Sequence, residues 1–406
     1  MRWSKVAWIV CALPAVLAAQ TDILKIEKAP WFAREVADGV TWKYYHFDDL
    51  FGGQQDVHIA EIDMDVAGTA LKFLYRPSVG ATVATYATDH ANTAATINGN
   101  FSNPAREIVQ FLRLDGTLIT PTWVDVQDEG GIVIDNSGFV DVVLRPSSGD
   151  WADRTEPNVM ASNVPLLTDG ALYPLPDIAF YMRDRHPRSA VGKTADNRLL
   201  LVAVDGRRAG AEGMTLDEMR TLFLGLGADD AQNLDGGGST SLWIRGEPGD
   251  QVVNTPSDGS LRLVASALAV VANPSTATMD HDARYMGASA YQATMTSATT
   301  QTVTMTFRNY GTTAWGAGTV LKTTEDRNRA SPFFTAGDWV SASSPGALNE
   351  SSVAPGADGT FTFTLTAPAV SAATAFTESF GVYDAAGGWL GPEQNRLTLT
   401  VLPKGV

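Results

Sequence analysis

The segment from Asn233 to Ser241, which reads NLDGGGSTS, combines residue types suited to chemistry on an anionic ligand. Three consecutive glycines are entropically costly to order, so an ordinary loop seldom keeps them. They permit left-handed backbone and let N–H groups converge on an anion, while Ser239 and Thr240 add hydroxyl donors. Asp235 could act as an acid, a base or an acceptor from a sugar hydroxyl. The simpler interpretation is a tight turn with a capping aspartate. No lysine follows the glycines, so the segment is not a P-loop.

Two further segments place charged residues where strands are expected to end or begin. Residues 204–208 read VDGRR, in which Asp205 offers a carboxylate and Arg207 a fork that matches phosphate geometry. Ligands often gather at strand ends in mixed folds, although a turn with solvated arginines is the simpler interpretation. Residues 186–192 read HPRSAVG, in which Arg188 could bind phosphate and His186 could donate a proton near neutral pH. A histidine before proline is also a common loop residue.

Two weaker segments complete the candidate chemistry. Residues 97–101 read INGNF, a turn signal whose apolar neighbours also allow Asn98 to be a buried ligand. Residues 256–259 read PSDG, a plain turn that contains Asp258 and is followed by Arg262. The sequence has no G-x-S-x-G, H-E-x-x-H or EF-hand pattern, and its five histidines are widely spaced. We therefore expect no metal and no cofactor.

Local patterns predict the elements that must hold these residues. The apolar run 198–204 predicts a strand buried on both faces. Thr215 and Glu218 form a capping box that opens an amphipathic helix, which Gly227 should end. The further predictions are a strand ending near residue 234, a hairpin from 241–245 and 251–253, and a closing strand at 262–272. Short alternating strands with few helices indicate an α+β domain with a mixed sheet over residues 22–272.

The chain of 406 residues carries 29 Lys and Arg against 45 Asp and Glu, a net charge of −16. Such acidity argues against general nucleic-acid binding. Residues 1–19 resemble a signal peptide, with Arg2 and Lys5 before the apolar stretch 6–17. We expect a secreted or periplasmic protein without stable membrane insertion; the alternatives are an uncleaved anchor or a buried strand. The single cysteine, Cys11, lies in this leader, so the mature chain would have neither disulfides nor thiol catalysis.

The composition changes at residues 273–276, which read NPST. We predict a linker at 273–284 and, over residues 285–406, an all-β sandwich with alternating strands. The clearest strand patterns are 302–308, 360–365 and 396–402.

In order and spacing, these segments resemble the phosphodiester glycosidase family over residues 55–272. The matching stretches are INGNF at 97–101, NVPLLTDG at 163–170, PRSAVG at 187–192, LLLVAVDGR at 199–207, GMTLDEM at 213–219, NLDGGGSTSL at 233–242 and VVNTPSDGSLRLVASALAVV at 252–271. The resemblance implies hydrolysis of a sugar-1-phosphodiester, or a phosphoglycan, to free sugar and a phosphomonoester. Departures at Asn100, Ser102, Ser162 and Asn163 affect the expected substrate shape more than the reaction class.

The resemblance also implies which residues form the site. They are Asn98, Arg188, Asp205, Arg207, Asn233, Asp235, Gly236, Gly237, Ser239, Thr240, Asp258 and Arg262. We expect Asp205, Asp235 and His186 to be catalytic and the others to bind substrate, with the role of each carboxylate left open. Two alternatives remain. One is a non-catalytic envelope protein that binds phosphosugars, and the other is a phosphodiesterase acting at phosphorus with a metal held by Asp205, Asp235 and Asp258.

The C-terminal region resembles the Ig-like module known as the four-tryptophan domain. The matching stretches are MTFRNYGTTAW at 305–315, VAPGADGTFTFTLTAP at 353–368 and WLGP at 389–392. The resemblance implies core positions for Trp315, Trp339 and Trp389. It also implies a spacer or binding role toward a surface glycan or protein, without catalysis.

Overall fold

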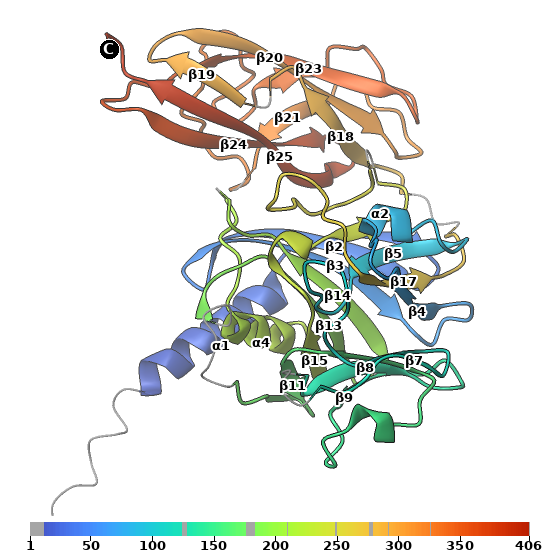
Figure 1. The fold of residues 1–406 in the computed structure, drawn as a ribbon. Helices are drawn as coiled ribbons and strands as arrows, with labels where there is room; N and C mark the ends of the chain where they lie inside the picture. The colour runs from blue at the N-terminus through green and yellow to red at the C-terminus, as the bar shows by residue number, and fades with distance from the viewer. Residues whose placement is uncertain are drawn as a thin grey trace, which may run out of the picture. The chain divides into compact units, whose positions relative to one another are not determined.

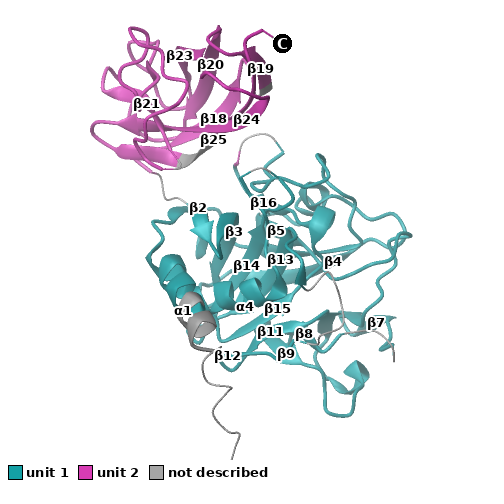
Figure 2. Ribbon diagram, turned by 90° about the vertical axis from the view of Figure 1, so that its left-hand side faces the viewer, with its two compact units in different colours: residues 1–246, 250–275 teal, residues 247–249, 276–406 magenta. Residues whose placement is uncertain are grey.

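The computed structural model describes residues 12–123, 128–175, 183–208, 210–247, 250–275, 279–290, 292–324 and 326–405. The chain forms two compact units (Figure 2). Unit 1 contains residues 1–246 and 250–275, and unit 2 contains residues 247–249 and 276–406.

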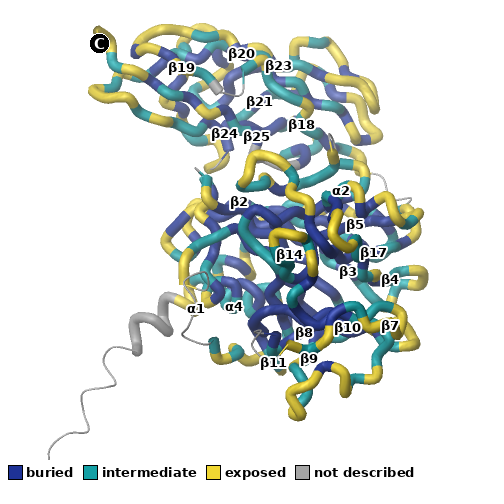
Figure 3. Tube along the Cα trace, in the orientation of Figure 1, coloured by how far each residue is buried: buried dark blue, intermediate teal, exposed yellow. Residues whose placement is uncertain are grey.

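An antiparallel eight-stranded sheet forms the centre of unit 1 (Figure 1). Its order is β1 (Phe32–Ala37), β2 (Val40–Leu50), β3 (Gly53–Asp63), β14 (Arg198–Val204), β13 (Arg188–Lys193), β15 (Asp230–Asn233), β11 (Pro165–Thr168) and β12 (Ala171–Leu172). The predicted strand at 198–204 is β14, and its residues 199–204 are buried, as Figure 3 shows for the sheet centre. Alternate residues of β14 enter two different hydrophobic cores, so both faces of the strand are covered, as predicted.

One face of the sheet packs against two helices, α1 (Ala12–Lys28) and α4 (Leu216–Gly225). The predicted capping box is present: the Thr215 hydroxyl accepts from the Glu218 amide, and the Glu218 carboxylate accepts from the Thr215 amide. Gly227 follows the helix with a φ of 77°, the left-handed conformation that glycine adopts without strain.

Two smaller sheets pack on the other face around a shared core. The first has the order β16 (Leu242–Ile244), β5 (Thr93–Asn98), β17 (Ser266–Val271) and β4 (Ala70–Tyr75). The second has the order β7 (Thr117–Thr120), β6 (Leu112–Leu114), β10 (Asn158–Ser162), β8 (Gly130–Ile134) and β9 (Val140–Leu144). The short helices are α2 (Val83–Tyr86), η1 (Trp151–Asp153) and η2 (Gly237–Ser239). Unit 1 is thus rich in strands with few helices, which fits the predicted α+β class. The predicted mixed sheet is wrong, because all strand pairs described in unit 1 run antiparallel.

Helix α1 runs through the predicted cleavage point at residues 18–19, while residues 1–11, including Cys11, lie outside the described part of the chain. Near its end, Ile26 is fully buried beside Gly225 of α4. Ile26 therefore lies beyond the predicted cleavage point. Among the described helices, none has the length and apolar content needed to span a membrane.

Unit 2 contains two sheets around one hydrophobic core. The first has the order β18 (Ala283–Ala288), β20 (Thr300–Asn309) and β23 (Asp358–Thr366). The second has the order β19 (Gln292–Thr296), β25 (Gly388–Leu402), β24 (Thr374–Asp384), β21 (Thr319–Thr323) and β22 (Gly346–Ala347). The Ig-like identity of this unit stays a prediction.

The expected core positions of the tryptophans hold for two of the three. Trp315 and Trp339 are buried in the core of unit 2. Trp389 is not, because Leu390 points inward and strand alternation turns Trp389 to the opposite face. There its ring lies edge-on to Tyr383, 5.6 Å between centroids.

The close approach of the two helices gives a test of the α1 contact. A Cβ at Gly225 would lie 2.8 Å from the Cβ of Ile26, so we expect Gly225→Ala to lower the free energy of unfolding by about 1–3 kcal/mol. With Ile26→Gly present, which removes the contacting Cβ, the same change should become neutral or stabilising, because alanine favours a helix over glycine by about 1 kcal/mol. Urea denaturation of the four proteins measures this coupling. Independent, additive effects would contradict the packing.

Candidate active site

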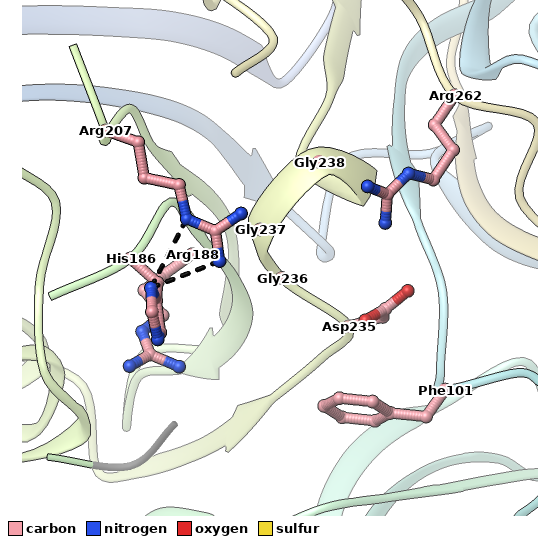
Figure 4. A pocket seen from close by; sticks show the side chains of 9 residues that line it. All are labelled: Phe101, His186, Arg188, Arg207, Asp235, Gly236, Gly237, Gly238 and Arg262. Atoms are coloured by element: carbon pink, nitrogen blue, oxygen red, sulfur yellow. Dashed lines mark hydrogen bonds between the residues drawn. The ribbon is translucent and has the colours of Figure 1, made fainter. Parts of the chain in front are cut away.

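A cavity of about 230 Å³ opens where β13, β14 and β15 meet their connecting loops. Its lining residues are Phe101, His186, Arg188, Arg207, Asp235, Gly236, Gly237, Gly238 and Arg262 (Figure 4). All except Phe101 and Gly238 belong to the residues predicted for the site. Segments far apart in the sequence therefore meet in one hollow.

Strand register brings these segments together. Arg188 at the start of β13 pairs with Val204 at the end of β14, and Ala190 pairs with Asn233 at the end of β15. Beyond the strands, the amide of Leu234 donates to the Ser189 carbonyl and that of Gly237 to the Pro187 carbonyl. The loop after β15 is thus fastened to the segment before β13, and both border the cavity.

The glycine loop is held differently from the predicted anion nest. The amide of Gly237 donates to the Pro187 carbonyl, and the amides of Ser239 and Thr240 donate to the carbonyls of Gly236 and Gly237, so these three donors are already engaged by protein groups. Positive charge at the cavity comes instead from arginine side chains. A Cβ on Gly236 would lie 2.9 Å from the Pro187 carbonyl oxygen, so the close backbone approach favours glycine there, whereas a Cβ on Gly238 would displace the side chains of Asp258 and Arg262.

Asp235 directs its carboxylate into the cavity, between Phe101 and Arg262 (Figure 4). Its backbone is fixed by the Asn98 amide, whose Nδ2 donates to the Asp235 carbonyl at 2.7 Å. Burial raises the pKa of Asp235 to about 6, although the Ser239 hydroxyl and the charge of Arg262 act to lower it. A carboxyl with this pKa can exchange a proton near neutral pH.

Asn98 itself is fully buried and does not line the cavity. Its Oδ1 accepts from the Ser189 hydroxyl at 2.7 Å and from the Ser241 amide at 3.2 Å. The Asn98 side chain therefore joins β5, β13 and the segment after the glycine loop. Asn98 therefore contributes to the site by holding Asp235, and not by contacting a ligand.

His186 and Arg207 face each other across one side of the cavity. Arg207 donates to His186 Nδ1 from Nε at 3.3 Å and from Nη2 at 3.1 Å. Partial burial and the nearby charges of Arg188 and Arg207 lower the pKa of His186, so the ring is neutral at pH 7. With Nδ1 accepting, the proton is assigned to Nε2, which can donate a hydrogen bond.

The other two cavity arginines are anchored by protein groups. Arg188 is buried, and it donates to the carbonyl oxygens of Met214 at 2.6 Å and Asp184 at 2.9 Å. Arg262 pairs with Asp258 at 2.6 Å and approaches the Ser239 hydroxyl at 3.4 Å. Asp258 thus orients Arg262, and Ser239 links Arg262 to Asp235.

Asp205 is not among the residues that line the cavity. Its Oδ1 accepts from Asn254 Nδ2 at 3.1 Å and from the Thr255 amide at 2.9 Å, and its Oδ2 accepts from Arg208 at 2.8 Å. Arg208 also binds Asp56. The Asp205 carboxylate thus fastens the start of the segment that continues to Asp258 and Arg262.

Asn233 and Thr240 also lie beneath the cavity rather than on its wall, and both are buried. Asn233 Nδ2 donates to the Asn163 carbonyl at 3.2 Å, and the Thr240 carbonyl accepts from Asn254 at 3.1 Å. Asp205, Asp235 and Asp258 do not gather around one point. Over the described ranges, we find no group of three His, Cys, Asp or Glu side chains that could hold a metal ion.

Sequence reasoning did not single out Phe101 and Gly238 as site residues. Both lie inside motifs that were recognised, INGNF and the glycine run. Phe101 directly follows a buried polar pair, Asn98 and Asn100, a pattern that could have indicated a side chain exposed to a ligand.

The partly buried carboxyl of Asp235 should affect stability with a defined sign. The pKa of Asp235 is about 6 in the folded protein, above the 3.8 of an unperturbed aspartate. The folded state therefore loses stability as the pH rises from about 4 to about 6, because ionising the enclosed group is costly. We expect Asp235→Asn to be more stable than the unsubstituted protein at pH 7.5, by up to about 3 kcal/mol, and similar to it at pH 4. Urea denaturation at both pH values tests this.

The matched control is Asp169→Asn at an exposed turn. It should show no such difference between the two pH values. Equal stability of Asp235→Asn and the unsubstituted protein at both pH values would contradict the raised pKa.

Residues 91–271 match the model of the phosphodiester glycosidase family. An uncharacterized protein of the SPbeta prophage of Bacillus subtilis, YomE, is 38% identical over 86 residues, which cover 21% of this chain and 13% of that protein. The chain thus spans only a small part of this relative's length.

Two solved structures are also similar at 19% identity. One is the zebrafish N-acetylglucosamine-1-phosphodiester alpha-N-acetylglucosaminidase catalytic domain auto-inhibited by its pro-peptide. Its match has a TM-score of 0.47 and covers 59% of this chain and 88% of that chain. The other is a hypothetical protein from Synechocystis, with a TM-score of 0.46 and coverage of 60% and 64%. The family match spans every predicted site residue from Asn98 to Arg262, so residues 91–271 are similar to the phosphodiester glycosidase family.

Proposed function

We propose that this protein hydrolyses the glycosidic bond of a sugar-1-phosphodiester, similar to an N-acetylglucosamine-1-phosphodiester, and releases free sugar and a phosphomonoester. The observation that carries the proposal is the pairing of Asp235, whose pKa is about 6, with Arg188, Arg207 and Arg262 in one cavity. A proton-transfer group thus lies beside a surface that attracts phosphate.

The phosphate occupies the arginine side of the cavity in this proposal. Arg207 turns its guanidinium toward the cavity, and Arg188 and Arg262 add charge from opposite sides (Figure 4). Guanidinium groups match phosphate oxygens in geometry and remain charged at all relevant pH values. In an acidic protein with a net charge of −16, this local cluster is what makes phosphate binding favourable.

The reaction then proceeds at the anomeric carbon. Water attacks C1, the bond from C1 to the bridging oxygen breaks, and its electron pair goes to the departing phosphate. Asp235 accepts the proton of the attacking water and stabilises positive charge on the sugar ring. The arginines stabilise the phosphate as its charge grows, a kind of contribution worth about 10²–10³ in rate per donor elsewhere. A phosphate is a good leaving group, so strong acid assistance is unnecessary.

His186 serves this step as a hydrogen-bond donor. Its Nδ1 accepts from Arg207, which leaves the N–H on Nε2 to bind a phosphate oxygen. Asp205 is a positioning residue in this proposal, since it fastens the segment that carries Asp258 and Arg262. Asn98 and Asn233 act in the same way through the strands that carry them.

The remaining expectations belong to this proposal. A secreted or periplasmic location after loss of residues 1–19 would expose the enzyme to phosphoglycans outside the cytoplasm. Unit 2, as an Ig-like module, would bind a surface glycan or protein.

An isotope experiment separates the chemistries. The purified, EDTA-treated protein is incubated with UDP-N-acetylglucosamine in ¹⁸O-water, and mass spectrometry locates the label. Label in the free sugar supports cleavage between carbon and oxygen at C1. Label in phosphate means attack at phosphorus and overturns the glycosidase mechanism. Binding of several such diesters without turnover would favour a binding protein.

The pH dependence should identify the form of Asp235 that works. A base must be ionised, so we expect kcat/KM to fall about tenfold per pH unit below pH 6. Asp235→Asn should lose at least about 10³-fold in kcat. Asp169→Asn, at its exposed turn, provides the matched control with unchanged rates. A rate that instead falls above pH 6 would mean that Asp235 acts as an acid.

A further inference from the structure

A second cavity, of about 330 Å³, adjoins the first. The two share Asp235 and Arg262, and the second also reaches Ser239. Its other lining residues are Ser102, Asn103, Pro104, Arg106, Leu263 and Val264. Asp235 therefore stands at the junction of two hollows, and only the first of them is used by the proposed phosphate site.

Arg106 is the cation that the mechanism does not use. Within the described part of the chain, its guanidinium has no hydrogen bond or ion pair, unlike Arg262, which pairs with Asp258. The side chain is half-buried. Its stem lies over Gly80, where a Cβ would come within 2.6 Å of Arg106 Cδ. A half-buried arginine without an anion on the protein is suited to an anion on a ligand.

A tight turn holds Arg106 in place. The Asn103 carbonyl accepts from the Arg106 amide at 2.8 Å, and the Asn103 side chain accepts from the Glu107 amide at 3.0 Å. Arg106 has a φ of 62°, in the left-handed region that arginine seldom adopts. Such a conformation costs about 1–2 kcal/mol for a residue with a Cβ.

The first cavity contains a second case of the same conformation. Arg207, which faces the proposed phosphate site, has a φ of 60°. Each cavity therefore presents one arginine on a left-handed backbone. Ten other described non-glycine residues also have a positive φ, so the conformation supports a ligand role here only together with the position of each arginine at a cavity.

We propose that the second cavity binds the sugar ring of the substrate and that Arg106 selects a sugar carrying an anionic substituent such as a carboxylate. This inference rests on the proposed function, because phosphate in the first cavity puts the scissile bond at Asp235 and the sugar beyond it. Asn103, Ser102 and Ser239 offer polar groups for sugar hydroxyls. Leu263, 43% exposed, offers an apolar wall for the ring face.

The test compares two substrates that differ only at C6 of the sugar: UDP-glucuronate, with a carboxylate, and UDP-glucose, with a hydroxymethyl group. We expect the KM for UDP-glucuronate to be about tenfold lower than that for UDP-glucose, as for one charge-assisted contact. Arg106→Asn should reduce this ratio to about one. Asparagine accepts left-handed backbone more readily than arginine does, so the variant should fold at least as well.

The matched control is Lys72→Asn, which removes an exposed cation that lines neither cavity. It should leave the ratio and both rates unchanged. A ratio near one in the unsubstituted protein would overturn the inference, and so would a preference that survives Arg106→Asn. An equal rise in KM for both substrates on Arg106→Asn would put the phosphate in the second cavity and also overturn it.

Binding separates this inference from the proposed function. Calorimetric titration of the same two nucleotide sugars into Asp235→Asn, with and without Arg106→Asn, requires no turnover. If neither compound is hydrolysed, the proposed function fails for them. A tenfold tighter binding of UDP-glucuronate that depends on Arg106 would still support the anionic sugar site, and its absence would overturn that site.

Discussion

The pairing of β13 with β14 on one side and β15 on the other is the constraint on which the site depends. This register aligns the start of β13 with the ends of its two neighbours, so that three connecting loops meet at one edge of the sheet. Asn98 then joins a second sheet to this edge through Ser189 and Asp235. Asp235 lies in the loop after β15, but its backbone is held on both sides, by the Asn98 side chain at its carbonyl and by the Gly99 carbonyl at its amide.

Enclosing that carboxylate has a cost that the surrounding charges only partly offset. Burial acts to keep Asp235 protonated, while Ser239 and Arg262 favour the ionised form, and the resulting pKa of about 6 reflects both. Arg262 is in turn held by Asp258, and both side chains lie against Gly238. The amides of Gly237, Ser239 and Thr240 already donate to carbonyls of Pro187 and of the loop, so arginine side chains supply the positive charge at the cavity.

Local sequence patterns predicted the elements well where one interaction decides the structure. The capping box at Thr215 and the apolar strand at 198–204 are such cases, because their residues contact close neighbours in sequence or a core on both sides. The motifs also predicted most of the residues that line the cavity. They did not predict that Asp205 lies outside it. Its partners Asn254 and Thr255 are about 50 residues away in the sequence, and they contact Asp205 only once the sheets have packed. The prediction that Trp389 points into the core was also wrong. Successive side chains of a strand point to opposite faces, so an error of one residue places a side chain on the wrong face of the sheet.

The two left-handed arginines show what sequence patterns leave out altogether. Neither Arg106 nor Arg207 has a side chain that favours a positive φ, and a turn containing either could have used glycine or asparagine without strain. Tertiary contacts hold both residues. The Arg106 side chain packs on Gly80 and its amide bonds to the Asn103 carbonyl, while Arg207 donates a hydrogen bond to His186. Positive φ also occurs at ten other described non-glycine residues, so what distinguishes these two arginines is their place beside the cavities that share or border Asp235. The same placement puts a cation on each side of a single carboxylate, an arrangement suited to a substrate that is charged on both sides of the bond to be broken.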